Sequence, residues 1–99
     1  KIAALDQRSR VVGIVASQNG RTLIMEQVPI AEDIAEGDRI VTSGMGKVFP
    51  KGLLIGYVVS VIDPPDGMFK KIEIQPAAKL RKIEEVFVMM SEEVDSANE

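Results

Sequence analysis

The chain has 99 residues, a formal net charge of −3 and an apolar fraction of 45%, which fits one globular domain with a modest core. It contains no cysteine and no histidine, which excludes disulfides, thiolate metal sites and the commonest general base. The negative charge, scattered basic residues and scarce aromatic residues give no support for nucleic-acid binding.

Four short strands are predicted in the first half of the chain, over residues 1–5, 10–17, 21–28 and 38–43. The second and third should form an antiparallel hairpin, because Asn19-Gly20 between them adopts positive φ easily. Residues 30–37 contain enough helix formers for one helical turn, which Gly37 would end as a C-cap.

Three further strands are predicted in the second half of the chain. Residues 56–62 are apolar at nearly every position, which predicts a central strand covered on both sides. In residues 69–76, Ile72 and Ile74 alternate with polar residues, as in a half-buried strand. Residues 84–90 are β-branched and aromatic enough for the last strand.

These elements predict an all-β fold, a small six- to seven-stranded and mostly antiparallel β-barrel. One or two short helical turns are expected, the second of them in residues 76–85 after Pro76. Residues 1–91 should form a single barrel domain, and residues 92–99 a flexible acidic tail. No apolar run approaches the ~20 residues that span a bilayer, and the chain begins with Lys1. We therefore expect a piece of a longer protein, in which any membrane anchor would lie upstream.

The run of residues 41–56 holds half of the glycines and raises the question of a phosphate site. A Walker loop would need a glycine at Val41 and a serine or threonine at Val48, and a dinucleotide fingerprint would need a glycine at Phe49. Both patterns fail, so no cofactor is predicted. Ser43 could act as a nucleophile only with a lysine base, Lys47 or Lys51, and we expect its hydroxyl to bond its own turn instead.

The acidic pairs of the chain do not predict a metal or an acid–base site. They are Glu32-Asp33, Glu84-Glu85 and Glu92-Glu93. Adjacent residues in a strand point to opposite faces, whereas a metal or catalytic site needs side chains that converge. We interpret them as solvated surface, with no metal site and no catalytic residues.

The residues of the glycine-rich run are better explained as structure and as a contact surface. Gly44 and Gly46 are expected in positive-φ turns, Gly52 before a strand, and Gly56 at a bulge or a close approach of the backbone. Met45, Phe49 and Pro50 are candidates for partner binding, because a large apolar side chain in a loop must fold back or meet a partner.

Three stretches of the chain resemble the family of the rod shape-determining protein MreC: residues 1–15, 36–61 and 67–89. The matching motif positions are Thr42, Ser43, Gly44, Gly46, Phe49, Pro50, Gly52, Leu53 and Gly56. The chain departs from the family pattern at Lys47, where a glycine is usual, and at Lys79, where an acidic residue is common. The resemblance covers nearly the whole chain and corresponds to the second, C-terminal β-barrel domain of the family's extracytoplasmic region.

The resemblance implies a membrane-anchored, non-catalytic scaffold of bacterial cell-wall elongation, located on the outer side of the cytoplasmic membrane. The implied partners are further copies of the protein, MreD, the MreB filament system and the elongation-specific penicillin-binding transpeptidase. Two alternatives from other classes stay open: a small ligand-binding β-barrel and a serine-lysine hydrolase that uses Ser43.

Overall fold

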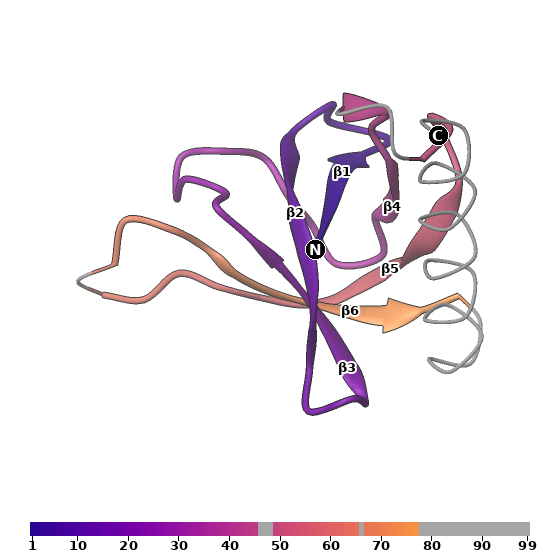
Figure 1. The fold of residues 1–99 in the computed structure, drawn as a ribbon. Helices are drawn as coiled ribbons and strands as arrows, with labels where there is room; N and C mark the ends of the chain where they lie inside the picture. Colours follow the sequence, from indigo (N-terminus) through magenta and orange to yellow (C-terminus); the bar gives the residue numbers. More distant parts are fainter. Residues whose placement is uncertain (46–48, 66, 78–99) are drawn as a thin grey trace.

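The computed structural model describes residues 1–45, 49–65 and 67–77, which form one closed β-barrel (Figure 1). The six strands of this described part are β1 (Ile2–Asp6), β2 (Val12–Gln18), β3 (Thr22–Glu26), β4 (Arg39–Thr42), β5 (Leu54–Ile62) and β6 (Lys71–Pro76). All pairs are antiparallel, in the order β1-β2-β3-β6-β5-β4, and β4 pairs again with β1. The predicted all-β, antiparallel barrel is confirmed.

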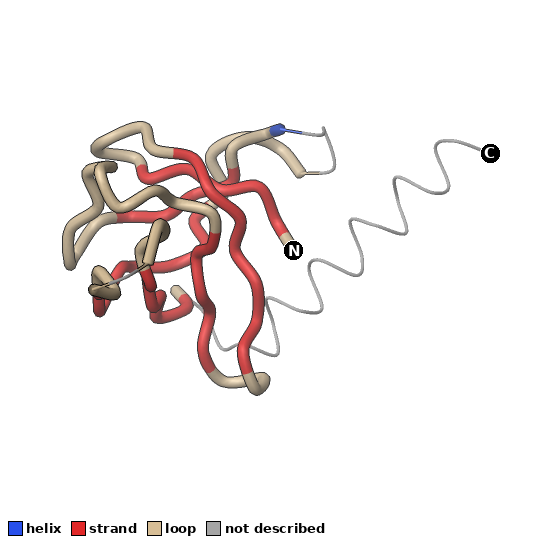
Figure 2. The backbone as a smooth tube through the Cα atoms, turned by 90° about the vertical axis from the view of Figure 1, so that its left-hand side faces the viewer, coloured by secondary structure: helices blue, strands red, loops and turns tan. Residues whose placement is uncertain are grey.

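Neighbours in the sequence form most of the barrel, and two pairings between distant strands close it. β1–β2, β2–β3, β4–β5 and β5–β6 are hairpins, whereas β3–β6 and β1–β4 join segments far apart in the chain. The end of the β2–β3 hairpin projects from the barrel (Figure 2). Asn19 and Gly20 form its turn with φ of 57° and 67°, which confirms the predicted hairpin.

The barrel interior is aliphatic, because alternate residues of each strand point inward. Ile72 and Ile74 of β6 are fully buried, as their alternation with polar residues predicted. The same period places two residues of β1, Ile2 and Ala4, in the core. Asp6 lies on the same face of β1, so its carboxyl enters the interior at one end of the barrel.

The prediction that residues 56–62 are covered on both sides is wrong. Val58 points into the barrel, whereas Tyr57, Val59 and Ile62 on β5 are exposed. A shift of register between Val58 and Ser60 marks a bulge in this strand. The strand is apolar on both faces, but a small barrel has only one interior.

The predicted helical turn over residues 30–37 is also wrong: this connection between β3 and β4 contains turns and irregular backbone. Gly37 does have a positive φ of 89°, but it precedes β4 instead of ending a helix. The predicted helical turns of residues 76–85, the predicted strand 84–90 and the tail 92–99 lie largely or wholly outside the described residues. In the described part, no helix is long and apolar enough to cross a bilayer.

Candidate functional site

The glycine-rich run forms the end of β4, a loop and the start of β5, and the loop folds back on Thr42. The backbone of Thr42 exchanges two hydrogen bonds: its N–H donates to Leu53 at 2.8 Å, and its carbonyl accepts from Gly52 at 2.8 Å. Its buried hydroxyl donates to the carbonyl of Pro50 and accepts from the N–H of Leu53 at 2.9 Å. The hydrogen bonds of this one threonine therefore hold the start and the end of the loop together.

The glycines of the run serve the backbone. Gly44 and Gly52 have φ of 77° and 92°, a region that side chains other than glycine rarely adopt. Gly56 lies against β6, where an added Cβ would stand 2.2 Å from the carbonyl oxygen of Gln75. Gly46 lies outside the described residues. The glycines therefore shape the loop and allow the close approach of β5 to β6.

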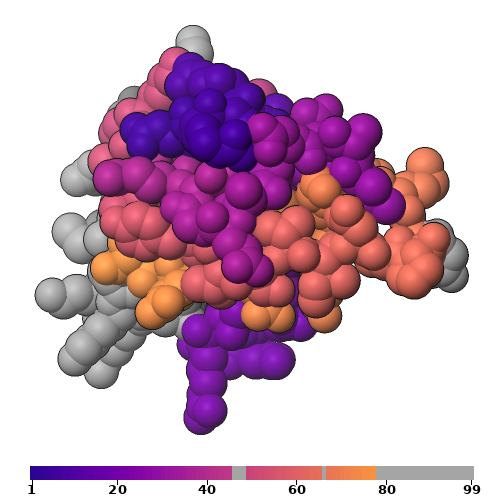
Figure 3. Space-filling model, turned by 180° about the vertical axis from the view of Figure 1, so that it is seen from behind, coloured from indigo at the N-terminus to yellow at the C-terminus, as the bar shows by residue number. Residues whose placement is uncertain are grey.

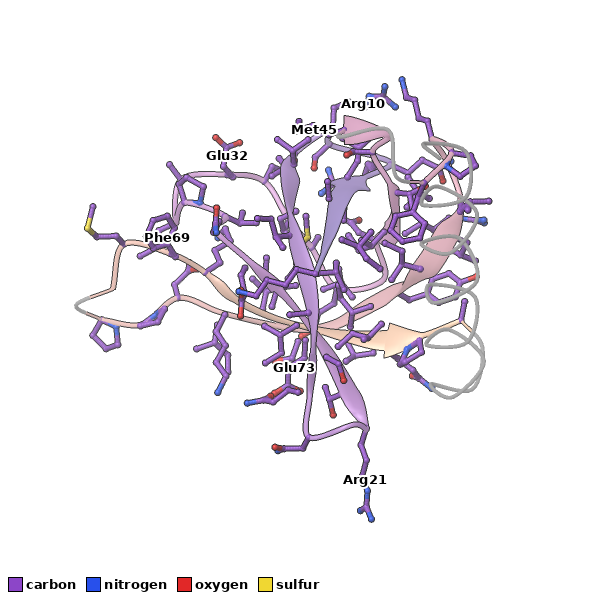
Figure 4. The ribbon with its side chains drawn as sticks, in the orientation of Figure 1. Arg10, Arg21, Glu32, Met45, Phe69 and Glu73 are labelled. Atoms are coloured by element: carbon purple, nitrogen blue, oxygen red, sulfur yellow. The ribbon has the colours of Figure 1, made fainter. Side chains whose placement is uncertain are left out.

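The three partner-binding candidates lie in different environments. Phe49 is half-buried and packs against the hydrophobic core, while Pro50 is exposed. Met45 is 65% exposed and lies at the same end of the barrel as Arg10 (Figure 4). Of the three, Met45 and Pro50 are exposed, and Phe49 joins the loop to the core.

Ser43 lacks the environment of a nucleophile. Its hydroxyl accepts a hydrogen bond from the N–H of Met45 at 3.1 Å, which is the local turn expected from the sequence. No described lysine forms a hydrogen bond with it, and Lys47 lies outside the described residues. The geometry gives no support for a serine-lysine pair.

Other exposed apolar side chains lie elsewhere on the barrel. Val59 and Ile62 lie on the outer side of β5, and Met68 and Phe69 lie in the β5–β6 loop, with Met68 exposed by 78%. This loop and the β2–β3 hairpin form two separate projections of the surface (Figure 3). Phe69 and Met45 lie well apart (Figure 4), so these side chains do not form one continuous patch.

A charged cluster that sequence reasoning missed joins the β1–β2 turn to the β3–β4 connection. Arg8 donates to both carboxylate oxygens of Asp38, from Nε at 2.8 Å and from Nη2 at 2.9 Å. It also donates to both oxygens of Asp33, from Nη1 at 2.8 Å and from Nη2 at 3.0 Å. Asp38 further accepts from the N–H of Ala35 at 3.0 Å. A single guanidinium therefore bridges two carboxylates of one connection.

Asp6 lies behind this cluster and is fully buried. Its Oδ1 accepts from the N–H groups of Arg8 at 2.9 Å and Ser9 at 3.2 Å, and its buried Oδ2 has no hydrogen-bond partner among the described residues. Burial, together with Asp38, raises the pKa of Asp6 to about 6. The Arg8 guanidinium holds the pKa of Asp38 and of Asp33 below the usual range.

The sequence offered only a weak signal for this cluster. Asp33 belongs to an adjacent acidic pair that was interpreted as solvated surface, and its side chain is exposed but ion-paired. Asp6 and Asp38 are far apart in the chain and come close because Asp6 pairs with Ile40, which is two residues after Asp38. Within the described residues, no group of three acidic side chains could hold a metal ion.

Comparison with known proteins gives a consistent result. The family model described as "Rod shape-determining protein MreC, barrel core" matches residues 1–90. The cell shape-determining protein MreC of Escherichia coli is 32% identical over 89 residues, which cover 88% of this chain and 24% of that protein. The chain spans between 20% and 30% of the length of the curated relatives that it matches.

Two solved structures share the fold. MreC from Pseudomonas aeruginosa superposes with a TM-score of 0.75 at 31% identity, over 80% of this chain and 52% of that one. A chain of the complex between penicillin-binding protein PBP2 and MreC from Helicobacter pylori has a TM-score of 0.67 at 22% identity, over 81% of this chain and 53% of that one.

Proposed function

The chain belongs to the MreC family of rod shape-determining proteins, and from this membership we propose that it is a non-catalytic scaffold domain of the bacterial cell-wall elongation machinery. In this role it helps to maintain rod shape through self-association and through contacts with cell-wall synthesis proteins. The observation that carries the proposal is the family match over residues 1–90, which includes every described strand.

The proposed enzyme partner is the elongation-specific penicillin-binding transpeptidase. An MreC protein has been solved in complex with PBP2 in Helicobacter pylori, which supports a partner of this class for the family. MreD, the MreB system and further copies of the chain are proposed partners from the same resemblance. Exposed apolar side chains in loops, such as Met45, provide surface for such contacts.

A scaffold role suits the chemistry of the site better than the alternatives do. The chain contains no histidine, and Ser43 bonds its own turn. A ligand-binding barrel would need a cavity with convergent polar groups. The largest fully buried side chains of the described part are mostly aliphatic, and the buried polar ones, Asp6 and Thr42, are held by internal hydrogen bonds. We place the domain on the outer side of the cytoplasmic membrane, carried there by an upstream anchor.

The proposal is tested in cells with the full-length, membrane-anchored protein. Removing residues 1–91 of this chain should abolish rod shape and the recruitment of the transpeptidase. Normal shape and normal recruitment without the barrel would refute the proposal. Recruitment is measured by co-purification from detergent-solubilised membranes.

A matched pair of point variants locates the contact. Met45→Glu places a charge in the proposed contact surface, and Met68→Glu makes the same change at another exposed methionine elsewhere on the barrel. We expect Met45→Glu to lower co-purification of the transpeptidase at least several-fold and Met68→Glu to leave it unchanged. The opposite result would move the contact to the β5–β6 loop. Phe49→Ala is less informative, since Phe49 also supports the core.

A further inference from the structure

Asp6 and Asp38 could bond each other only through a proton. Two ionised carboxylates only accept hydrogen bonds and repel each other, so two carboxyl groups can bond only when one of them is protonated. Asp6 and Asp38 are both buried, both accept hydrogen bonds from Arg8, and the buried Oδ2 of Asp6 has no donor among the described residues. A proton on one of the two carboxyls would satisfy this oxygen and remove the repulsion.

The surrounding donors assign this proton to Asp6. Three N–H groups already bind the two oxygens of Asp38, two from Arg8 and one from Ala35, and they stabilise it as a carboxylate. The N–H donors of Asp6 both bind Oδ1, and its buried Oδ2 has no donor among the described residues. Oδ2 is therefore the atom that would carry the proton and donate a hydrogen bond to the carboxylate of Asp38.

We propose that this shared proton makes a pH-sensitive clasp, in which protonated Asp6 fastens the β1–β2 turn to the β3–β4 connection and loosens it on ionising. The clasp brings together two segments that no strand pairing joins, residues 7–10 and 33–38. Loss of the proton would leave two buried carboxylates in contact at one end of the barrel.

The charges around the clasp strengthen this effect. Asp6 faces Asp38, and Arg8 from the β1–β2 turn and Asp33 from the β3–β4 connection complete the cluster. The positive charge of Lys70, the last residue of the β5–β6 loop, also lowers the pKa of Asp33. The Arg8 guanidinium binds Asp33 and Asp38 but not Asp6, so an ionised Asp6 would add a third negative charge that no guanidinium contact offsets. The neutral form of Asp6 is therefore the one that the fold favours.

The direction of the pH dependence follows from these states. In the unfolded chain Asp6 loses its proton near the usual value of 3.8, whereas the folded chain keeps it up to a pKa of about 6. Between these values the folded state binds the extra proton, so the stabilisation is complete below the unfolded pKa and is lost as the pH rises through the folded one. Since the two values differ by about 2 units, the unfolding constant should rise by up to roughly 100-fold.

The test uses the 99-residue chain in two measurements. Carbon-13 NMR of the Asp6 side-chain carboxyl should show a titration midpoint near pH 6. Urea unfolding between pH 4 and 7.5 should show lower stability at the higher pH. In Asp6→Asn this loss of stability at the higher pH should vanish, since the amide N–H can still donate to Asp38 but does not titrate. Protection of the Ala35 amide from hydrogen exchange should fall over the same range in the wild type alone.

A control variant and the NMR result keep the proposal falsifiable. Asp63→Asn makes the same change at an exposed carboxylate paired with Lys70, and it should retain the pH dependence of the wild type. An Asp6 titration at or below pH 3.8 would overturn the clasp, and so would an Asp6→Asn variant with the wild-type pH dependence. If Asp6→Asn fails to fold, the NMR titration of the wild type decides alone.

Discussion

Gly56 and Thr42 show how single residues of the glycine-rich run act on the barrel. Thr42 joins the two ends of the β4–β5 loop through four hydrogen bonds of its backbone and hydroxyl. The Cα of Gly56 lies so close to the backbone of β6 that a side chain would not fit between them. Both residues act through shape and hydrogen bonding within the fold.

At this scale we predict that Gly56→Ala is strongly destabilising. The added Cβ would stand 2.2 Å from the carbonyl oxygen of Gln75 and 2.8 Å from Ile74, so β5 and β6 would have to separate. Overpacking of this kind typically costs about 1–3 kcal/mol, and a backbone atom that cannot rotate away favours the upper end. Urea unfolding of the chain measures the change.

Gly20→Ala is the control for this prediction. Its Cβ would meet nothing within 4 Å, although φ is +67°. The substitution should therefore cost only the strain of that conformation, about 1–2 kcal/mol. Equal losses for the two variants would contradict a role for close packing at Gly56.

The β4–β5 loop combines an anchored and an exposed apolar residue. Phe49 packs against the core, whereas Met45 is 65% exposed. A loop of this kind can present a surface without losing its own conformation, because the half-buried aromatic ring holds it in place. This separation suggests that stability and partner binding can be changed independently.

We therefore predict that two alanine substitutions in this loop differ in their effect on stability. Phe49→Ala should lower the free energy of unfolding by about 1–3 kcal/mol, less than a fully buried phenylalanine would lose. Met45→Ala should change it by less than about 0.5 kcal/mol, as for most surface positions. Thermal or urea unfolding distinguishes them, and a large loss for Met45→Ala would show that this side chain supports the fold.

Closure is the property that belongs to the whole molecule. Each strand of the described barrel has two neighbours, so none of the six is left as a free edge along its whole length. β1 closes the barrel by pairing with both β2 and β4. The closing pairs connect distant parts of the chain, and we expect the barrel to unfold in one cooperative transition.

Two truncations test this scale and the proposed domain boundary. Removing residues 1–6 deletes β1, exposes the edges of β2 and β4, and should abolish cooperative unfolding. Removing residues 92–99, the acidic tail expected from the sequence, should change the free energy of unfolding by less than about 0.5 kcal/mol. Calorimetry compares them, and a large loss without the tail would contradict a boundary at residue 91.

The sequence by itself indicated the six strands of the described part, the Asn19-Gly20 turn, the lack of histidine and cysteine, and the family resemblance. These features depend on residue type, on short-range periodicity and on the φ preferences of adjacent residues. They can therefore be read from neighbouring positions in the chain.

Only the tertiary structure decided which apolar residues lose contact with water and which charged residues meet. Residues 56–62 are apolar on both faces, and closure of the barrel buried only one of them. Phe49 could have been exposed, and packing placed it against the core. The pairing of β1 with β4 brings Asp6, Arg8 and Asp38 together, because it aligns distant segments in one register. That register cannot be predicted from the residues adjacent in the sequence.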